Sequence, residues 1–267
     1  MERETGFEPA TSSLGSWHST TELLPLTCKV GAKHLSEHPQ FYLNLTLLRA
    51  SAIMKWMPFE EALAAVLPSD LPHRDTILSQ AARHLDLIAQ VNEHLNLTRI
   101  TAPTEAAIKH VLDSVLPWRL FAGAKQILDA GTGAGFPGIP LALVFPEIQF
   151  TLSESIQKKA RFVQSVIEAL NLPNVTISSQ RAEVIQTAGL ITARAVAPVS
   201  RAIVLFAPAL KKGARVLLYK GPDVATEIAE ASAEARKRQI TVRIVETYDL
   251  PNSLGARTIV ELSPSKN

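Results

Sequence analysis

Apolar positions change their spacing along this chain, and the change separates a helical region from an alternating one. Between Pro58 and Pro117 the apolar residues recur every three or four positions, which predicts helices over 58–67 and 75–95 and a third that begins at Pro103. Farther along, short apolar runs alternate with amphipathic stretches, an order typical of parallel strands joined by helices. We therefore expect strands that end at Asp129 or cover 149–153, 174–178, 190–193 and 213–219, with helices over 156–170 and 223–237.

The segment QILDAGTGAGFPG, residues 126–138, joins the first expected strand to a helix that continues through GIPLALVF. It holds four glycines within nine residues, at positions 131, 133, 135 and 138. Glycine adopts positive φ without strain and lets a ligand approach the main chain closely. A strand, a glycine-rich loop and a helix N-terminus together form a binding site for a nucleoside cofactor. The alternative is a tight turn that binds nothing, but such a turn does not need alternating glycines.

The order of acidic residues and glycines bears on which cofactor binds. Gly133 to Gly138 fits the GxGxxG fingerprint of dinucleotide sites, which is a weak signal when it stands alone. Asp129, however, precedes the glycines in a D-x-G-x-G-x-G pattern, which is typical of S-adenosylmethionine enzymes because they have no pyrophosphate to bind. Glu154 follows the next strand, where a carboxylate can accept both ribose hydroxyls in either cofactor class, with an ordinary solvated acid as the alternative. These residues favour S-adenosylmethionine over NAD.

The end of the chain also separates the two cofactor classes. Two strands, expected over 241–248 and 256–262, follow each other without a helix between them and must pair antiparallel. A parallel sheet that ends in such a hairpin is the architecture of the common methyltransferases, and an NAD-binding domain is not expected to end this way. The predicted fold class is α/β: a Rossmann-like class I S-adenosylmethionine-dependent methyltransferase with a mostly parallel seven-stranded sheet, a C-terminal antiparallel hairpin and a helical cap before the sheet.

The first fifty residues differ from the rest. Residues 1–53 contain scattered Ser, Thr, Gly and Pro without sustained periodicity, and their opening resembles a translated structural-RNA gene. We therefore expect translation to start at Met54 or Met57, with a flexible native tail as the alternative. The predicted organisation is a non-native or disordered extension over 1–53, a helical cap over 54–120 and a Rossmann-like methyltransferase domain over 121–267.

Composition narrows the class of protein. Hydrophobic residues make up 46% of the 267 positions, and the formal net charge is only +2, so a basic surface would have to be local. The single cysteine, Cys28, excludes an internal disulfide or a thiolate metal cluster and fits a reducing compartment. The apolar runs are far shorter than the roughly 20 residues that span a bilayer, and no secretory signal is visible. We expect a cytoplasmic protein that binds neither a membrane nor a metal.

Charged residues after the loop supply further candidates. Lys158 and Arg161 lie on the polar face of the helix over 156–170, where they could contact RNA phosphates, although a solvated helix face is the commoner explanation. Residues 181–183 follow the third strand, where a loop can lie over an adenine ring. Arg194 ends the fourth strand at the edge of the sheet where ligands bind, with a surface ion pair as the alternative.

Polar residues of the helical region are expected to be structural. His73, His84 and His94 lie outside the apolar stripe of their helix, so we expect them to be exposed or at its rim rather than metal ligands. A structural role is also expected for three polar groups at helix ends or on one helix: Asn96, His110 and Asp113.

Longer motifs point to a family. The segments DAGTGAGFPGIPLA, TLSESIQKKARFVQSVIEALNLPNV, RAEVI, ARAVAPV and LYKG, with NLTRIT and KHVLDSVLPW before them, resemble the bacterial small-subunit ribosomal RNA guanine-N7 methyltransferases, also known as glucose-inhibited division protein B. The resemblance runs from about Pro58 to Leu262, and the GxGxGxPGIPLA and RAVAP segments are specific to this family. It implies S-adenosylmethionine-dependent methylation of N7 of a guanine in 16S ribosomal RNA, in the decoding-region loop of the small subunit.

The resemblance also carries roles over to single residues. Together with the loop and strand arguments it implies seven cofactor contacts, at Gly131, Gly133, Phe136, Glu154, Ala182, Glu183 and Arg194. The chain departs from the family pattern in three places: Glu154 replaces the usual aspartate, Ala188-Gly189 replace a Phe-Asp pair, and Ala193 replaces a common serine. The first change should preserve ribose binding, and the others weaken the details at the edge of the fourth strand.

The implied chemistry needs no general base, because guanine N7 carries a lone pair and no proton. We therefore name no catalytic residue and expect catalysis by alignment of the reacting atoms. Phosphate contacts are expected from four basic residues: Lys158, Lys159, Arg161 and Lys220. The expected partner is 16S ribosomal RNA, as naked RNA, small subunit or assembly intermediate, and the protein is expected to be a monomer. Two other classes stay open: an NAD-dependent oxidoreductase with the same loop, and a cofactor-binding or RNA-binding protein without turnover.

Overall fold

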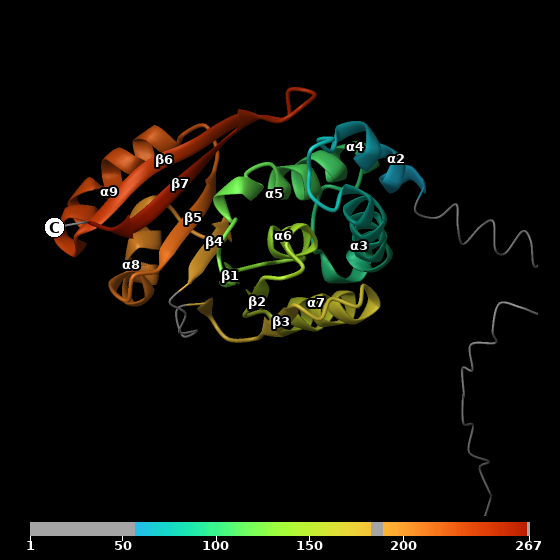
Figure 1. The fold of residues 1–267 in the computed structure, drawn as a ribbon, viewed down its shortest axis with the longest axis horizontal. Coiled ribbons are helices and arrows are strands. Elements are labelled where there is room, and N and C mark those ends of the chain that lie inside the picture. The colour runs from blue at the N-terminus through green and yellow to red at the C-terminus, as the bar shows by residue number, and fades with distance from the viewer. Residues whose placement is uncertain (1–56, 183–188, 266–267) are drawn as a thin grey trace, which may run out of the picture. The chain divides into compact units, whose positions relative to one another are not determined.

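The computed structural model describes residues 57–182 and 189–265, which belong to one compact unit (Figure 1). The expected extension over 1–53 and the residues Glu183 and Ala188 lie outside the described residues. Within the described ranges, no helix combines the length and the apolar character that a membrane span requires.

The helices before the sheet form where the spacing of apolar residues predicts them. In the longest one, Ile77, Ala81, Leu85 and Ile88 are buried at helical intervals. The predicted third helix is continuous but not uniform, because its middle is π-helical. The elements of this helical cap are α2 (Met57–Val66), α3 (Arg74–Leu95), α4 (Pro103–Ala106), the π-helix η1 (Ala107–Leu112), α5 (Asp113–Val115) and the 3-10 helix η2 (Trp118–Leu120).

Seven strands form one sheet in the order β3-β2-β1-β4-β5-β7-β6. The first five pair parallel, whereas β7 pairs antiparallel with both β5 and β6, so the predicted C-terminal hairpin is confirmed. The strands are β1 (Gln126–Ala130), β2 (Gln149–Ser153), β3 (Val175–Ser178), β4 (Leu190–Arg194), β5 (Arg215–Lys220), β6 (Ile240–Asp249) and β7 (Ala256–Pro264). The helices among them are α6 (Gly138–Val144), α7 (Gln157–Ala169), α8 (Val199–Lys211) and α9 (Val224–Arg238).

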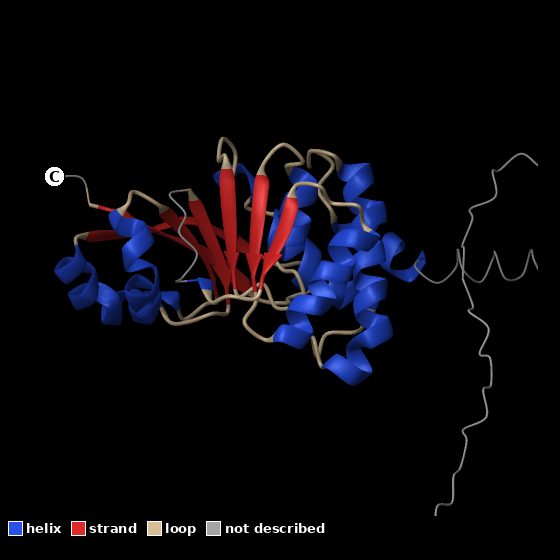
Figure 2. Cartoon of the chain, turned by 90° about the horizontal axis from the view of Figure 1, so that it is seen from below, coloured by secondary structure: helices blue, strands red, loops and turns tan. Residues whose placement is uncertain are grey.

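Two hydrophobic clusters lie on opposite faces of the sheet, because successive side chains of a strand point to opposite sides. In β1, Ile127 belongs to the cluster that contains the helical cap, α6 and α7, whereas Leu128 belongs to the cluster of α8 and α9. Figure 2 shows helices on both sides of the strands. The predicted fold, with a helical cap packed over the sheet, is confirmed.

The strand order reverses direction at β1, which has β2 on one side and β4 on the other. In open parallel sheets, ligands bind beyond the carboxyl ends of the strands at this reversal. The loop after β1 and the segment after β4 (195–198) lie there and define the region of the candidate site.

Candidate functional site

Asp129 holds the glycine-rich loop against the end of β1. Its side chain is fully buried, and Oδ2 accepts hydrogen bonds from the Thr132 hydroxyl at 2.6 Å and from the Gly138 N–H at 2.9 Å. The Thr132 N–H donates to the Ser153 carbonyl at 3.0 Å, which ties the loop to the end of β2. The buried carboxylate of Asp129 therefore fixes the conformation of the loop by accepting hydrogen bonds from it.

The pH dependence of stability should report the burial of Asp129. Burial raises the pKa of this carboxyl to about 6, against opposing hydrogen bonds from Thr132 and Gly138. Since the folded state keeps the proton up to about pH 6 and the unfolded state loses it near 3.8, Asp129 lowers stability as the pH rises between these values, by on the order of 3 kcal/mol. An asparagine at this position would accept the same two hydrogen bonds without ionising. We expect the melting temperature of Asp129→Asn, relative to wild type, to rise from pH 4 to pH 7; a difference independent of pH would contradict this.

Three loop glycines have no room for a side chain. One is Gly135, where a Cβ would lie 2.5 Å from Cδ1 of Ile139 and 3.0 Å from Cε1 of His84. Gly131 has φ +70°, and a Cβ there would lie 2.9 Å from Cγ2 of Val196, in the segment after β4. A Cβ at Gly138 would overlap the Leu152 side chain and lie 2.6 Å from Oδ2 of Asp129. Glycine is therefore required where the loop meets these neighbours.

The first pocket, about 260 Å³, lies at the carboxyl ends of three adjacent parallel strands. Gly131 follows β1, Glu154 follows β2 and Ala182 comes from the chain after β3, while Val196 closes the pocket from the segment after β4. The structure thus brings together three of the predicted cofactor residues, from segments distant in sequence.

The Glu154 carboxylate is fixed in place beside this pocket. It is 7% exposed, and its Oε1 accepts the Ile156 N–H at 2.7 Å while its Oε2 accepts the Gly133 N–H at 3.2 Å. Gly133 therefore joins the site through its backbone. Each carboxylate oxygen has a second lone pair that can accept a hydroxyl, so the group is ready to bind a vicinal diol such as a ribose.

A second pocket, about 380 Å³, lies beyond the ends of β4 and β5. Its walls include Arg194 and Tyr219 from these strands and Lys109 and His110 from the helical cap. The segment after β4 separates the two pockets. Ala195 lines the second pocket, and the next two residues, Val196 and Ala197, line the first. Ala195 has φ +57°, a conformation rare for residues with a Cβ, at the point where the chain turns between the pockets.

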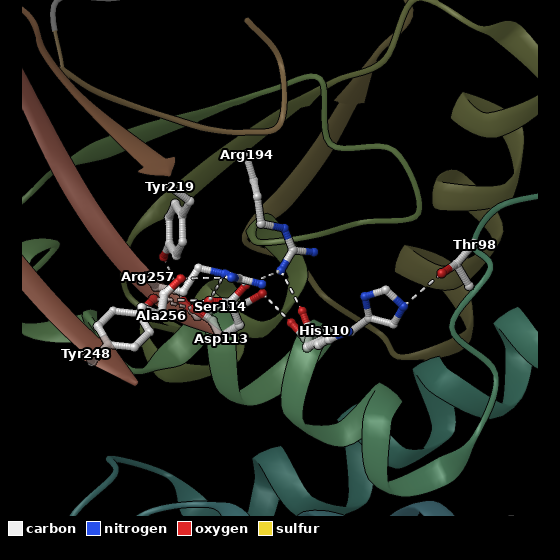
Figure 3. A network of polar contacts seen from close by, with 10 residues as sticks. Thr98, His110, Asp113, Ser114, Arg194, Tyr219, Tyr248, Ala256 and Arg257 are labelled. Carbon is white, nitrogen blue, oxygen red and sulfur yellow. Dashed lines mark hydrogen bonds and ion pairs between the residues drawn. The ribbon is translucent and has the colours of Figure 1, made fainter. Parts of the chain in front are cut away.

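Arg194 lines the second pocket and not the first, where Gly131, Glu154 and Ala182 lie. Its Nη1 donates to the Lys109 carbonyl at 3.0 Å. The same nitrogen donates to Oδ2 of Asp113 at 3.3 Å (Figure 3). The guanidinium carbon lies 5.5 Å from the ring centroid of Phe136, a cation–π distance. The contacts of Arg194 with Asp113 and Lys109, more than eighty positions away, have no signal in the sequence.

Phe136 packs under the helical cap, between two histidines. The rings of His84 and His110 stack on it, each with a centroid distance of 4.7 Å. Contact between Phe136 and a cofactor stays a prediction, and the described side chain serves as a platform for Arg194.

The expectation that His84 is exposed or at the rim is wrong, because the residue is fully buried. His84 belongs to α3, which packs against α2, α6 and α7. The buried face of α3 is therefore wider than the stripe of apolar residues from which the sequence prediction was made. Burial lowers the pKa of His84 to about 4 and that of His110 to about 3, and both are therefore neutral at pH 7. His84 Nε2 carries its proton, since it lies 2.8 Å from the Ala134 carbonyl, which can only accept.

Lys220 braces the segment between the two pockets. Its side chain is 11% exposed, and its Nζ donates to the Ala197 carbonyl at 3.0 Å and lies 2.5 Å from Oε2 of Glu227. The same Glu227 oxygen accepts the Val199 N–H at 3.0 Å, at the start of α8. Contact between Lys220 and a phosphate stays a prediction. The contacts of Lys220 with Ala197 and Glu227 favour a role in holding the segment between the pockets.

The other three basic candidates lie in the first two turns of α7. Lys158 and Arg161 are exposed and Lys159 is half-buried. The helix begins just after Ser155, which lines the first pocket. Cations at a helix N-terminus add to the positive end of the helix dipole, so this turn is suited to phosphate. Among the described residues, no group of three or more His, Cys, Asp or Glu side chains is placed to hold a metal ion.

Comparison with known proteins matches one family model and relatives with the same name. A family model described as rRNA small subunit methyltransferase G matches residues 77–254. Ribosomal RNA small subunit methyltransferase G of Solibacter usitatus is 62% identical over 209 residues, which are 77% of this chain and 100% of that protein. The protein of the same name from Carboxydothermus hydrogenoformans is 36% identical over 69% of this chain and 82% of its own length. The solved O-methyltransferase from Bacillus cereus has a TM-score of 0.47 at 20% identity, over 68% of this chain and 90% of that one.

Proposed function

The chain belongs to the ribosomal RNA small subunit methyltransferase G family, and we propose that it methylates N7 of a guanine in 16S ribosomal RNA with S-adenosylmethionine as methyl donor. The observation that carries the proposal is the first pocket, where Gly131, Glu154 and Ala182 meet at the ends of three parallel strands. Its position at the reversal of strand order is the one that nucleoside cofactors use in such sheets.

The residues of the first pocket fit the adenosine part of the cofactor. Glu154 would accept the ribose hydroxyls through the lone pairs that Gly133 and Ile156 leave free. Ala182 would pack against the adenine ring, and Gly131, which has no room for a side chain beside Val196, would present its backbone to the ligand. The bound cofactor supplies an electrophilic methyl group on a sulfonium.

The second pocket would receive the target base. It adjoins the first along the segment 195–198, so a base there would lie next to the methyl donor where the two pockets meet at Ala195 and Val196. Arg194 would orient the nucleotide from its position over Phe136. His110, neutral at pH 7, also lines this pocket and adds no charge to it. The exposed basic turn of α7 would bind flanking phosphates.

Alignment is the main task of these residues. The cofactor, held by Gly131, Glu154 and Ala182, would supply the methyl group to the N7 lone pair, and the electrons of its carbon–sulfur bond would stay on sulfur. No proton moves, so the protein needs only to hold both partners in line and exclude water. The rigid attachment of Glu154 and Arg194 serves this purpose, because each accepts or donates at least two hydrogen bonds.

The modification pattern of 16S RNA tests the function. We expect RNA from cells that lack this gene to lose one 7-methylguanosine, seen as one missing chain break after borohydride reduction and aniline cleavage. The wild-type gene should restore the break, and a Glu154→Ala variant produced at the same level should not. If the pattern of breaks is the same with and without the gene, the assigned substrate is wrong.

A further inference from the structure

We propose that Asp113 is a positioning residue for the methyl transfer, because its carboxylate fixes Arg194 at the wall of the second pocket. The inference rests on the proposed function, and it assigns a role to a residue that lines the second pocket together with Arg194 and acts through that arginine. It contrasts with the purely structural role that the sequence predicts for Asp113.

Asp113 is the centre of a buried polar network (Figure 3). Its side chain is 2% exposed, and Oδ2 lies 3.3 Å from Nη1 of Arg194. Nε of Arg257 lies 3.3 Å from both carboxylate oxygens. The Tyr248 hydroxyl donates to Oδ1 at 3.2 Å and lies 3.1 Å from the Asp113 carbonyl. Every oxygen of the carboxylate thus has a partner from the sheet.

The network connects the helical cap to the part of the sheet beside the second pocket. Asp113 is the first residue after the π-helix η1, and its partners come from β4, β6 and β7. The next residue, Ser114, accepts the Tyr219 hydroxyl of β5 through its carbonyl at 2.8 Å. A π-helical turn holds more residues than an α-helical turn and so rotates the residues that follow it. This rotation explains how Asp113 comes to face the strand ends.

The charge of Asp113 matters because two arginines share it. Arg194 and Arg257 approach the same buried carboxylate, whose negative charge offsets their mutual repulsion. Without that charge, Arg194 would keep only the Lys109 carbonyl and the ring of Phe136 as partners among the contacts described above. It would then gain rotamer freedom and lose its alignment over the pocket.

The test compares Asp113→Asn and Asp113→Glu with a matched control. Glu261→Gln is that control, because Glu261 is also a buried carboxylate between two arginines, Arg215 and Arg243, but lies in the sheet away from both pockets. We expect both Asp113 variants to lower kcat for methyl transfer to small subunits by ~10- to 100-fold, as a displacement of about 1 Å can. The Kd for S-adenosylmethionine, measured by calorimetry, should change less than threefold. Glu261→Gln should lower the melting temperature and leave kcat within twofold.

A double-mutant cycle with Arg194→Met separates positioning from a general structural effect. If Asp113 acts through Arg194, the double variant should be no slower than Arg194→Met alone. The proposal is overturned if the two losses multiply, if folded Asp113→Asn and Asp113→Glu keep wild-type kcat, if cofactor binding is lost together with kcat, or if neither variant folds. An inactive wild-type protein would instead overturn the proposed function, and this inference with it.

Discussion

Replacement of Gly131 by valine should abolish the binding of S-adenosylmethionine, with a loss of affinity of ~100-fold or more. Gly131 has φ +70°, where a β-branched residue is strained, and its Cβ would come within 2.9 Å of Val196. The two methyl groups of valine would then occupy the first pocket, which Gly131 lines together with Glu154 and Ala182. The backbone of the segment that carries Val196 is held by Lys220, which donates to the neighbouring Ala197 carbonyl.

Calorimetry with S-adenosylmethionine measures this loss, and Gly213→Val controls for backbone strain. Gly213 has φ +92°, a Cβ there would meet nothing within 4 Å, and the residue lies after α8, outside the first pocket. Both variants should therefore lose stability in thermal melts, and only Gly131→Val should lose binding. Wild-type affinity in folded Gly131→Val would mean that the cofactor binds elsewhere.

The architecture could be predicted from the sequence because it depends on local signals. The stretch between 248 and 256 is too short for a crossover, so the last two strands had to pair antiparallel, and they do. Element ends were less predictable: the strand expected from Gly213 begins at Arg215, because Gly213 takes a positive φ in the turn after α8. Within six residues, the π-helical period of η1 cannot be told from that of an α-helix.

The candidate site could be predicted only where it consists of backbone and strand ends. Gly131, Glu154 and Ala182 meet because parallel strands end at one edge, which the pattern of elements already implies. Side-chain direction is a different matter, since it depends on packing between distant elements. Lys220 turns inward to Glu227, His84 lies beneath the loop, and neither outcome is visible in local periodicity.

Substitution of Arg194 by methionine should lower kcat for methyl transfer by ~100- to 1000-fold, the scale seen when one preorganised donor is removed from an active site. Methionine is long and unbranched and can keep the packing over Phe136, while the donors to Lys109 and Asp113 and the positive charge are lost. Because Arg194 lines the second pocket and not the first, the Kd for S-adenosylmethionine should change little.

Arg119→Met is the matched control for the loss of charge. Arg119 is 64% exposed, pairs with Asp70 at 2.6 Å and stacks on Trp118, away from the contacts that hold Arg194. Both variants lose one positive charge, so any general weakening of RNA binding should be equal at a given salt concentration. Single-turnover methylation of small subunits then separates the loss of substrate alignment from the loss of charge. Arg119→Met should retain at least half of the wild-type rate. Equal rates for the two variants would show that Arg194 contributes only charge, and that the second pocket does not hold the target guanine.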